Sequence, residues 1–181
     1  IPVHWGKNQK GMQAEQEICI NEQQKARQSW LNSSARAIED TKNLVELGIH
    51  KQVANRILEP YSWITVILSG TDFGNFFMLR ANKDAQPEFQ KLAYMMLGNY
   101  LCNEPKKLNY GEWHIPFGDK IPEDMSINDK LKIATARCAR VSYLTHDGKS
   151  DFNRDFELHD DLKNSGHWSP FEHCAQNMDN L

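Results

Sequence analysis

The 181-residue sequence lacks the features that would mark a membrane protein, a nucleic-acid-binding protein or a secreted disulfide scaffold. Its apolar stretches, such as Trp63 to Leu68, are far shorter than the roughly 20 residues of a membrane span. The net charge of −3 lacks the basic excess that attracts nucleic acid. We therefore expect neither a membrane nor a nucleic-acid partner.

Cysteine is scarce and scattered. No C-x-x-C pair is formed by the four cysteines, which are Cys19, Cys102, Cys138 and Cys174. This scatter favours reduced thiols in a cytoplasmic protein over a disulfide framework. The N-terminus shows no signal-peptide pattern, and its start at Ile1 without Met leads us to expect a piece of a longer protein.

The composition is that of an ordinary globular protein, with 40% hydrophobic and 25% charged residues. The length suffices for one sizeable core, so we expect a single domain over residues 1–181. Residue spacing and local stop signals predict helices at 13–47, 50–58, 72–80, 85–101, 126–139 and 154–164. The helix-rich mixture predicts an α+β fold.

The segments between these helices carry their own signals. Residues 62–69 are rich in β-branched and aromatic residues and predict a buried strand. Residues 103–124 are rich in Pro, Gly and Asn and predict a long surface loop, and residues 141–144 predict a short extended piece. Gly48 and Gly166 are expected to end the helices that precede them.

The stretch Ser165-Gly-His-Trp-Ser-Pro-Phe-Glu-His173 places two histidines around a proline. By itself this pattern is typical of a turn with structural histidines. A metal site would need a third ligand, such as His159 or Cys174, and nothing in the spacing supports one. We therefore predict no metal.

Other polar residues also have a plain structural explanation when each is taken alone. Arg56 could clamp a phosphate with its planar guanidinium, or simply lie on the surface. Asn75 and Arg80 suit recognition of a polar ring edge, although an arginine at a helix end also complements the helix dipole. Cys138 is interpreted as a buried thiol and not as a nucleophile.

Taken together, the motifs resemble the flavin-dependent thymidylate synthase family over roughly residues 40–175. The matching blocks are Asn55-Arg-Ile-Leu-Glu-Pro60, Asn75-Phe-Phe-Met-Leu-Arg80, Ala85-Gln-Pro-Glu88, Ala139-Arg-Val-Ser-Tyr143 and Gly166-His-Trp-Ser-Pro-Phe-Glu-His173. Each block holds several fixed residues of a family motif, so chance does not account for all of them.

The order of the blocks departs from the usual family member. The blocks within 136–175 follow those within 50–90, whereas the usual order is the reverse. The arrangement resembles a circularly permuted member, as in phage-like and some bacterial relatives. The family's R-H-R-x7-S segment, which supplies flavin-contacting arginines and a serine near the nucleotide, is not in the sequence and is expected upstream of Ile1.

The resemblance implies the fold of that family, with a small, mainly antiparallel sheet, and its activity. That activity is the reductive methylation of dUMP to dTMP. The carbon comes from 5,10-methylenetetrahydrofolate and the hydride from FAD that NADPH has reduced, without an active-site cysteine. The resemblance also implies a homotetramer with shared active sites, in the cytoplasm of a bacterium or of a phage's host.

Residue by residue, the resemblance implies catalytic roles for Arg80, at the uracil ring of dUMP, and for His167, near the flavin and the folate. Arg56 matches the arginine that binds the dUMP phosphate. Asn75 and Ser169 match flavin-contacting residues.

Further positions in these blocks have less defined roles. Ser69 stands at another flavin-side position, where the usual family member has Asn. Glu172 and His173 complete a motif that fits a structural hydrogen-bond pair as well as direct catalysis. The alternative to an active enzyme is a non-catalytic or partial chain of this fold that binds FAD and dUMP weakly. Because the R-H-R segment is missing, we expect the 181-residue chain alone to be inactive.

Overall fold

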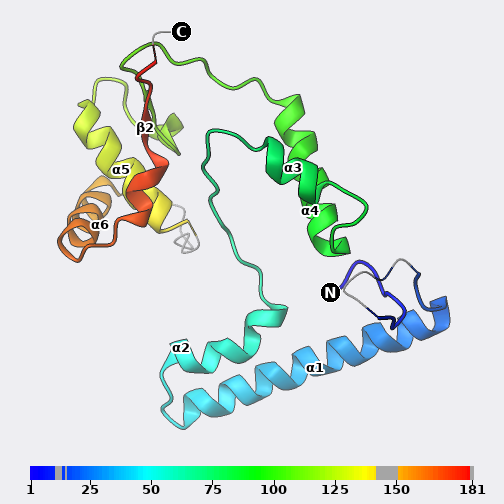
Figure 1. Cartoon of the computed structure of the whole chain (residues 1–181). Helices are drawn as coiled ribbons and strands as arrows, with labels where there is room; N and C mark the ends of the chain where they lie inside the picture. The colour runs from blue at the N-terminus through cyan, green and yellow to red at the C-terminus, as the bar shows by residue number, and fades with distance from the viewer. Residues whose placement is uncertain (11–13, 15, 142–150, 180–181) are drawn as a thin grey trace. The chain divides into compact units, whose positions relative to one another are not determined.

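The computed structural model describes residues 1–10, 14, 16–141 and 151–179 (Figure 1). The chain divides into two compact units, the first formed by Ile1–Trp63 and Asp72–Glu104, the second by Ile64–Thr71 and Pro105–Leu181. The described residues are dominated by α-helices and contain a two-stranded antiparallel sheet, which confirms the α+β class. The assignment of the whole chain to a single domain stays a prediction.

The first unit begins with α1 (Ile20–Glu46), against which α2 (Lys51–Ala54) and the 3-10 helix η1 (Asn55–Tyr61) fold back (Figure 1). The buried Ala37 and Thr41 of α1 face the fully buried Ala54. The Thr41 hydroxyl donates to the Ala37 carbonyl at 2.7 Å and lies 3.4 Å from the Ala54 carbonyl. At the far end of η1 the Tyr61 ring meets the Trp30 ring edge-on, with 5.7 Å between centroids.

Helix α1 ends where the sequence predicts and begins later than predicted. Gly48 has φ 80°, and its N–H donates to the Val45 carbonyl at 3.0 Å, as in a Schellman motif. The predicted start at residue 13 is wrong, because residues 16–18 pair with the N-terminal segment. The Ile18 N–H donates to the Trp5 carbonyl at 3.0 Å, which takes this backbone out of the helix.

The first unit also contains α3 (Gly74–Arg80) and α4 (Pro87–Cys102). The Asp72 carboxylate accepts from the Gly74 N–H at 2.7 Å at the start of α3. The rings of Phe73 and Phe77 lie 6.3 Å and 5.4 Å from the ring of Tyr100, so an aromatic cluster joins the two helices.

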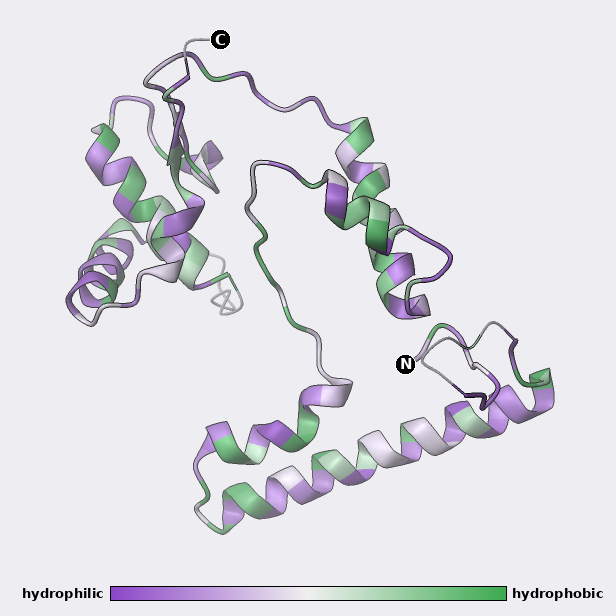
Figure 2. Cartoon of the chain, in the orientation of Figure 1, coloured by the Kyte–Doolittle hydropathy of each residue, from purple (hydrophilic) through white to green (hydrophobic). Residues whose placement is uncertain are grey.

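The predicted buried strand at 62–69 is wrong. These residues form neither strand nor helix, and Trp63, Ile64 and Val66 are 100%, 80% and 65% exposed. Figure 2 shows the stretch as a hydrophobic segment outside any helix. β-Branched residues favour an extended backbone, but burial needs a neighbouring strand, and the sheet found among the described residues does not reach this segment.

The second unit is built around α5 (Ile127–Ala139) and α6 (Phe152–Asn164), which pack together (Figure 1). The 3-10 helix η3 (Ser169–His173) also packs on α5, and Ile133, Ala134 and Ala136 of α5 are fully buried. The predicted helix at 126–139 is confirmed, and Ser126 caps it: the Ser126 hydroxyl accepts from the Asp129 N–H at 3.2 Å.

A two-stranded antiparallel sheet completes this unit. Strand β1 (Trp113–His114) pairs with β2 (Ala175–Gln176), with Trp113 opposite Gln176. The predicted loop at 103–124 therefore contains a strand, and it also contains the 3-10 helix η2 (Gly118–Lys120). Of the predicted extended piece at 141–144, residues 142–144 lie outside the described residues. No helix in the described part of the chain is long and apolar enough to cross a membrane.

A buried carboxylate joins the two main helices of the second unit. Asp155 on α6 is 1% exposed, and its two carboxylate oxygens accept from Nε and Nη2 of Arg140 at 2.8 Å and 3.2 Å. The Nε atom of Arg137 lies 3.6 Å from the same carboxylate. Such a carboxylate is stable in the interior only because it is paired on both oxygens.

Asp155→Ala is expected to lower the free energy of unfolding by about 3–5 kcal/mol, because it leaves buried positive charge without a partner. Urea unfolding followed by circular dichroism measures the change. The matched control is Asp161→Ala, an exposed aspartate on the same helix, which should shift stability by less than about 0.5 kcal/mol. Equal losses in both variants would contradict the assigned importance of the buried pair.

Candidate functional site

The segment that follows α6 carries the Gly166–His173 block, which contains several of the polar side chains predicted to form a site. Gly166, at φ 75°, ends α6 as predicted: its N–H donates to the Lys163 carbonyl at 3.3 Å, and the N–H of His167 donates to the Leu162 carbonyl at 2.9 Å. This Schellman motif fixes the backbone at His167, whose ring is exposed. Its Nδ1 lies 3.3 Å from the Ser165 hydroxyl.

The 3-10 helix η3 continues directly from this turn. Its first residue is Ser169, which is exposed, and Pro170 occupies the first turn. Phe171 turns inward, where its ring lies 5.3 Å from the Trp168 ring and 5.1 Å from the ring of the buried His159. The aromatic contacts hold η3 on the helical core and leave the Ser169 hydroxyl at the surface.

His159 and Cys174, considered above as metal ligands, have structural neighbours. The Nδ1 atom of His159 lies 2.7 Å from the Asp160 carboxylate. This hydrogen bond, together with a contact from the Lys132 ammonium at 3.3 Å, lowers the pKa of the exposed Asp160. Cys174 lies 3.9 Å from the hydroxyl of Thr135. Among the residues with a described position, no group of three His, Cys, Asp or Glu side chains could hold a metal ion.

One contact joins two of the motif segments. The Ser69 hydroxyl lies 2.9 Å from Nδ1 of His173, although the two residues are 104 positions apart in the sequence. Both belong to the second unit. The segment that carries Ser69 is therefore hydrogen-bonded to the end of η3. The sequence alone gave no signal for this pairing.

Arg140 of the Ala139–Tyr143 block serves the core. Its guanidinium is committed on two nitrogens to the buried Asp155. Sequence reasoning missed Asp155, since one acidic residue in the first turn of a helix is expected without any special role. The signal that points to it is a pair of arginines, Arg137 and Arg140, on a helix with a largely buried face.

The remaining predicted site residues lie on the first unit. Arg56 is exposed on η1. Asn75 lies at the start of α3 and Arg80 at its end, and both side chains are exposed. All three polar groups are accessible to a ligand, and α3 carries an amide and a guanidinium on the same short helix.

The two thiols of the second unit, Cys138 and Cys174, have raised pKa values. Burial, with a smaller contribution from Cys174, raises the pKa of Cys138 to about 11. Burial also raises the pKa of Cys174, against a hydrogen bond from Thr135 that lowers it. Cys138 is 5% exposed, which confirms its interpretation as a buried thiol. A thiol that stays protonated at neutral pH is a poor nucleophile.

Comparison of the chain with protein-family models, with curated proteins and with solved structures finds no match.

The cysteines are expected to fall into two reactivity classes with iodoacetamide near pH 8. Cys19 and Cys102 are exposed and should alkylate readily. Cys138 should react at least about tenfold more slowly, because its raised pKa leaves very little thiolate and burial blocks access. Peptide mass mapping over time measures each rate. Raising the pH towards 11 should accelerate Cys138 most, and equal rates at all three positions would refute the assignment.

Proposed function

We propose that the chain belongs to a flavin-dependent thymidylate synthase with a circularly permuted motif order. The reaction is the methylation of dUMP to dTMP with 5,10-methylenetetrahydrofolate and FAD reduced by NADPH. The proposal includes the family fold, a homotetramer with shared active sites and a cytoplasmic enzyme. It rests on the five sequence blocks and on one structural observation, which joins Ser69 to the last of these blocks.

The observation that carries the proposal is the hydrogen bond between Ser69 and His173. Ser69 precedes the Asn75–Arg80 block, and His173 closes the Gly166–His173 block. Within the second unit, the 2.9 Å contact brings the serine that the resemblance assigns to the flavin side onto the end of the Gly166–His173 block. It supports a shared role for these two positions, which are distant in sequence.

The polar groups of the blocks fit a flavin nucleotide. Ser169, His167 and Asn75 are exposed and offer a hydroxyl, an imidazole and an amide, which are the donors and acceptors that ring heteroatoms and ribose hydroxyls require. Trp168, which stands between His167 and Ser169 in the sequence, is 56% exposed and presents an aromatic ring. When bound, reduced FAD would supply the hydride of the reaction.

The arginines of the first unit fit an anionic nucleotide substrate. A guanidinium at Arg56 suits the phosphate of dUMP, because its planar fork donates two parallel hydrogen bonds. Arg80 is assigned to the uracil ring, where a fixed positive charge favours the ionised pyrimidine and stabilises negative charge that develops during methylation. Both side chains are exposed and therefore accessible to a nucleotide.

His167 is assigned to orient the flavin and the folate. Its backbone is fixed by the turn at Gly166, so the imidazole projects from a rigid turn.

The raised pKa of Cys138 agrees with a family that uses no active-site cysteine, because a thiol with a pKa of about 11 stays protonated at neutral pH.

The proposed activity is tested on the protein expressed from the complete reading frame that encodes these residues, in which the proposal requires an R-H-R-x7-S segment. We expect this protein to copurify with a yellow flavin and to release tritium from dUMP labelled at carbon 5 when folate and NADPH are added. The 181 residues alone should bind FAD and dUMP weakly and release none. Absence of both flavin and tritium release from the protein of the complete reading frame would exclude the synthase.

In the protein of the complete reading frame, replacement of the two arginines is expected to change different kinetic constants. Arg56→Ala should raise the KM for dUMP about 10–100-fold with a smaller change in kcat, because it removes a charged hydrogen-bond donor to the phosphate. Arg80→Ala should lower kcat about 100-fold or more, because it removes charge stabilisation at the reacting ring.

Steady-state kinetics separate the two effects. The matched control is Arg27→Ala, an exposed arginine of α1 that lies outside every motif block. It should change neither constant by more than about twofold. Identical profiles for the Arg56 and Arg80 variants would contradict the separate roles.

A further inference from the structure

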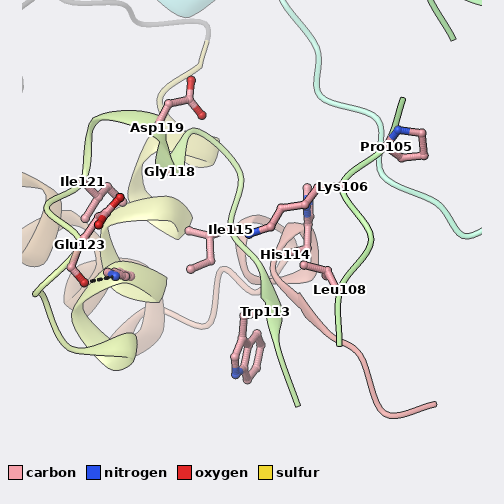
Figure 3. A pocket seen from close by; sticks show the side chains of 11 residues that line it. Pro105, Lys106, Leu108, Trp113, His114, Ile115, Gly118, Asp119, Ile121 and Glu123 are labelled. Carbon is pink, nitrogen blue, oxygen red and sulfur yellow. Dashed lines mark hydrogen bonds between the residues drawn. The ribbon is translucent and has the colours of Figure 1, made fainter. Parts of the chain in front are cut away.

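The second unit holds a pocket that none of the motif blocks forms. It has a volume of about 510 Å³ and is lined by residues from the segment 105–123 and by Lys130 of α5 (Figure 3). Pockets for small molecules in proteins commonly have volumes of ~300–1,000 Å³. The pocket is therefore large enough for a small organic ligand. It is separate from the residues of the proposed synthase site.

Part of the pocket wall is apolar and is held in place by the sheet. Trp113 and Ile115 come from β1 and the residue after it, and Ile121, which also lines the pocket, is buried. The strand is held by its pairing with β2, and the Glu112 carbonyl accepts from the Asn177 N–H at 2.9 Å. The Asn177 side-chain amide also donates to the carbonyl of Leu108, another lining residue, at 2.8 Å.

The loop beneath the pocket is held in an uncommon conformation. Phe117 has φ 56° and is the residue before η2, which contributes lining residues. Left-handed backbone disfavours a bulky residue, so the surrounding contacts must hold it. One such contact is the Arg137 guanidinium, which donates to the Phe117 carbonyl at 2.5 Å. A wall held this way exists before any ligand arrives.

The pocket lining holds an ammonium without an ion pair. Its charged residues are two lysines and two carboxylates, Lys106, Lys130, Asp119 and Glu123. The Lys130 ammonium donates to the Glu123 carbonyl at 2.7 Å. Lys106 has no ion pair within the described part of the chain, and it is the last of the causes that lower the pKa of Glu112. Figure 3 shows the Lys106 ammonium directed towards Ile115, whereas the Asp119 carboxylate points away from the other labelled side chains.

We infer that this pocket binds a small monocarboxylate with a flat apolar body, such as an aromatic carboxylate. The Lys106 ammonium would pair with the carboxylate, and Trp113 and Ile115 would contact the ring. An ammonium without an ion pair can take up one negative charge. A phosphate is better matched by a guanidinium fork, and the lining residues include no arginine.

The inference is tested by titrating the isotope-labelled chain with benzoate and with its neutral isostere, benzamide, by nuclear magnetic resonance. The indole N–H signal of Trp113 is identified by its loss in Trp113→Phe. We expect benzoate to shift this signal saturably with a Kd of about 1 mM, which is ordinary for a ligand of this size. Benzamide should bind at least about fivefold more weakly, because it lacks the charge.

Two neighbouring lysines provide a matched pair of variants. Lys106→Met should weaken benzoate binding about fivefold, and Lys106→Arg should restore most of it. Lys107→Met removes the same charge one residue away, at a position that does not line the pocket, and should leave the Kd unchanged. The inference is overturned if benzoate gives no saturable shift, if benzamide binds equally well, or if the two Met variants have the same effect.

Discussion

The paired carboxylate of Asp155 is the interaction on which the second unit depends. It is 1% exposed and joins α6 to α5 through Arg140 and Arg137. Apolar contacts between two helices tolerate sliding, but a bidentate pair fixes their register along and around both axes. The helix α6 leads through the turn at Gly166 into η3. The register of α6 on α5 therefore determines the position of His167.

The buried pair at Asp155 also connects the Gly166–His173 block with the separate pocket in the same unit. Arg137 contacts the carboxylate through one nitrogen and the Phe117 carbonyl through another, so it touches the core and the pocket loop together. The pocket wall on β1 is in turn paired with β2, which directly follows η3. The Gly166–His173 block and the pocket therefore share a scaffold, and no residue of that block lines the pocket.

Much of the fold could be predicted from the sequence where a local rule decides the structure. Gly48 and Gly166 end their helices because each residue adopts a left-handed conformation that glycine accepts most readily. Ser126 begins α5 because its hydroxyl reaches the third backbone N–H of that helix. The start of α1 was missed, since residues 16–18 are held by hydrogen bonds to a distant segment.

The candidate site follows the same division. The motif blocks name the candidate residues, whose roles stay predictions, and the buried state of Cys138 was predicted correctly. The contact of Ser69 with His173 and the pairing of Asp155 with Arg140 depend on segments that approach only after folding. Local spacing carries no information about such pairs. The burial of residues 62–69 was predicted wrongly because strand propensity does not supply a neighbouring strand.

The exposed stretch from Trp63 to Leu68 has a consequence for the fate of the chain in a cell. It is six residues long, contains no charge, glycine or proline, and is rich in side chains that favour extended backbone. Segments of this kind stack into cross-β aggregates when they stay uncovered. The yield of usable protein therefore depends on how quickly a chaperone or another surface covers this stretch after synthesis, and charged substitutions within it would act on aggregation before they act on anything else.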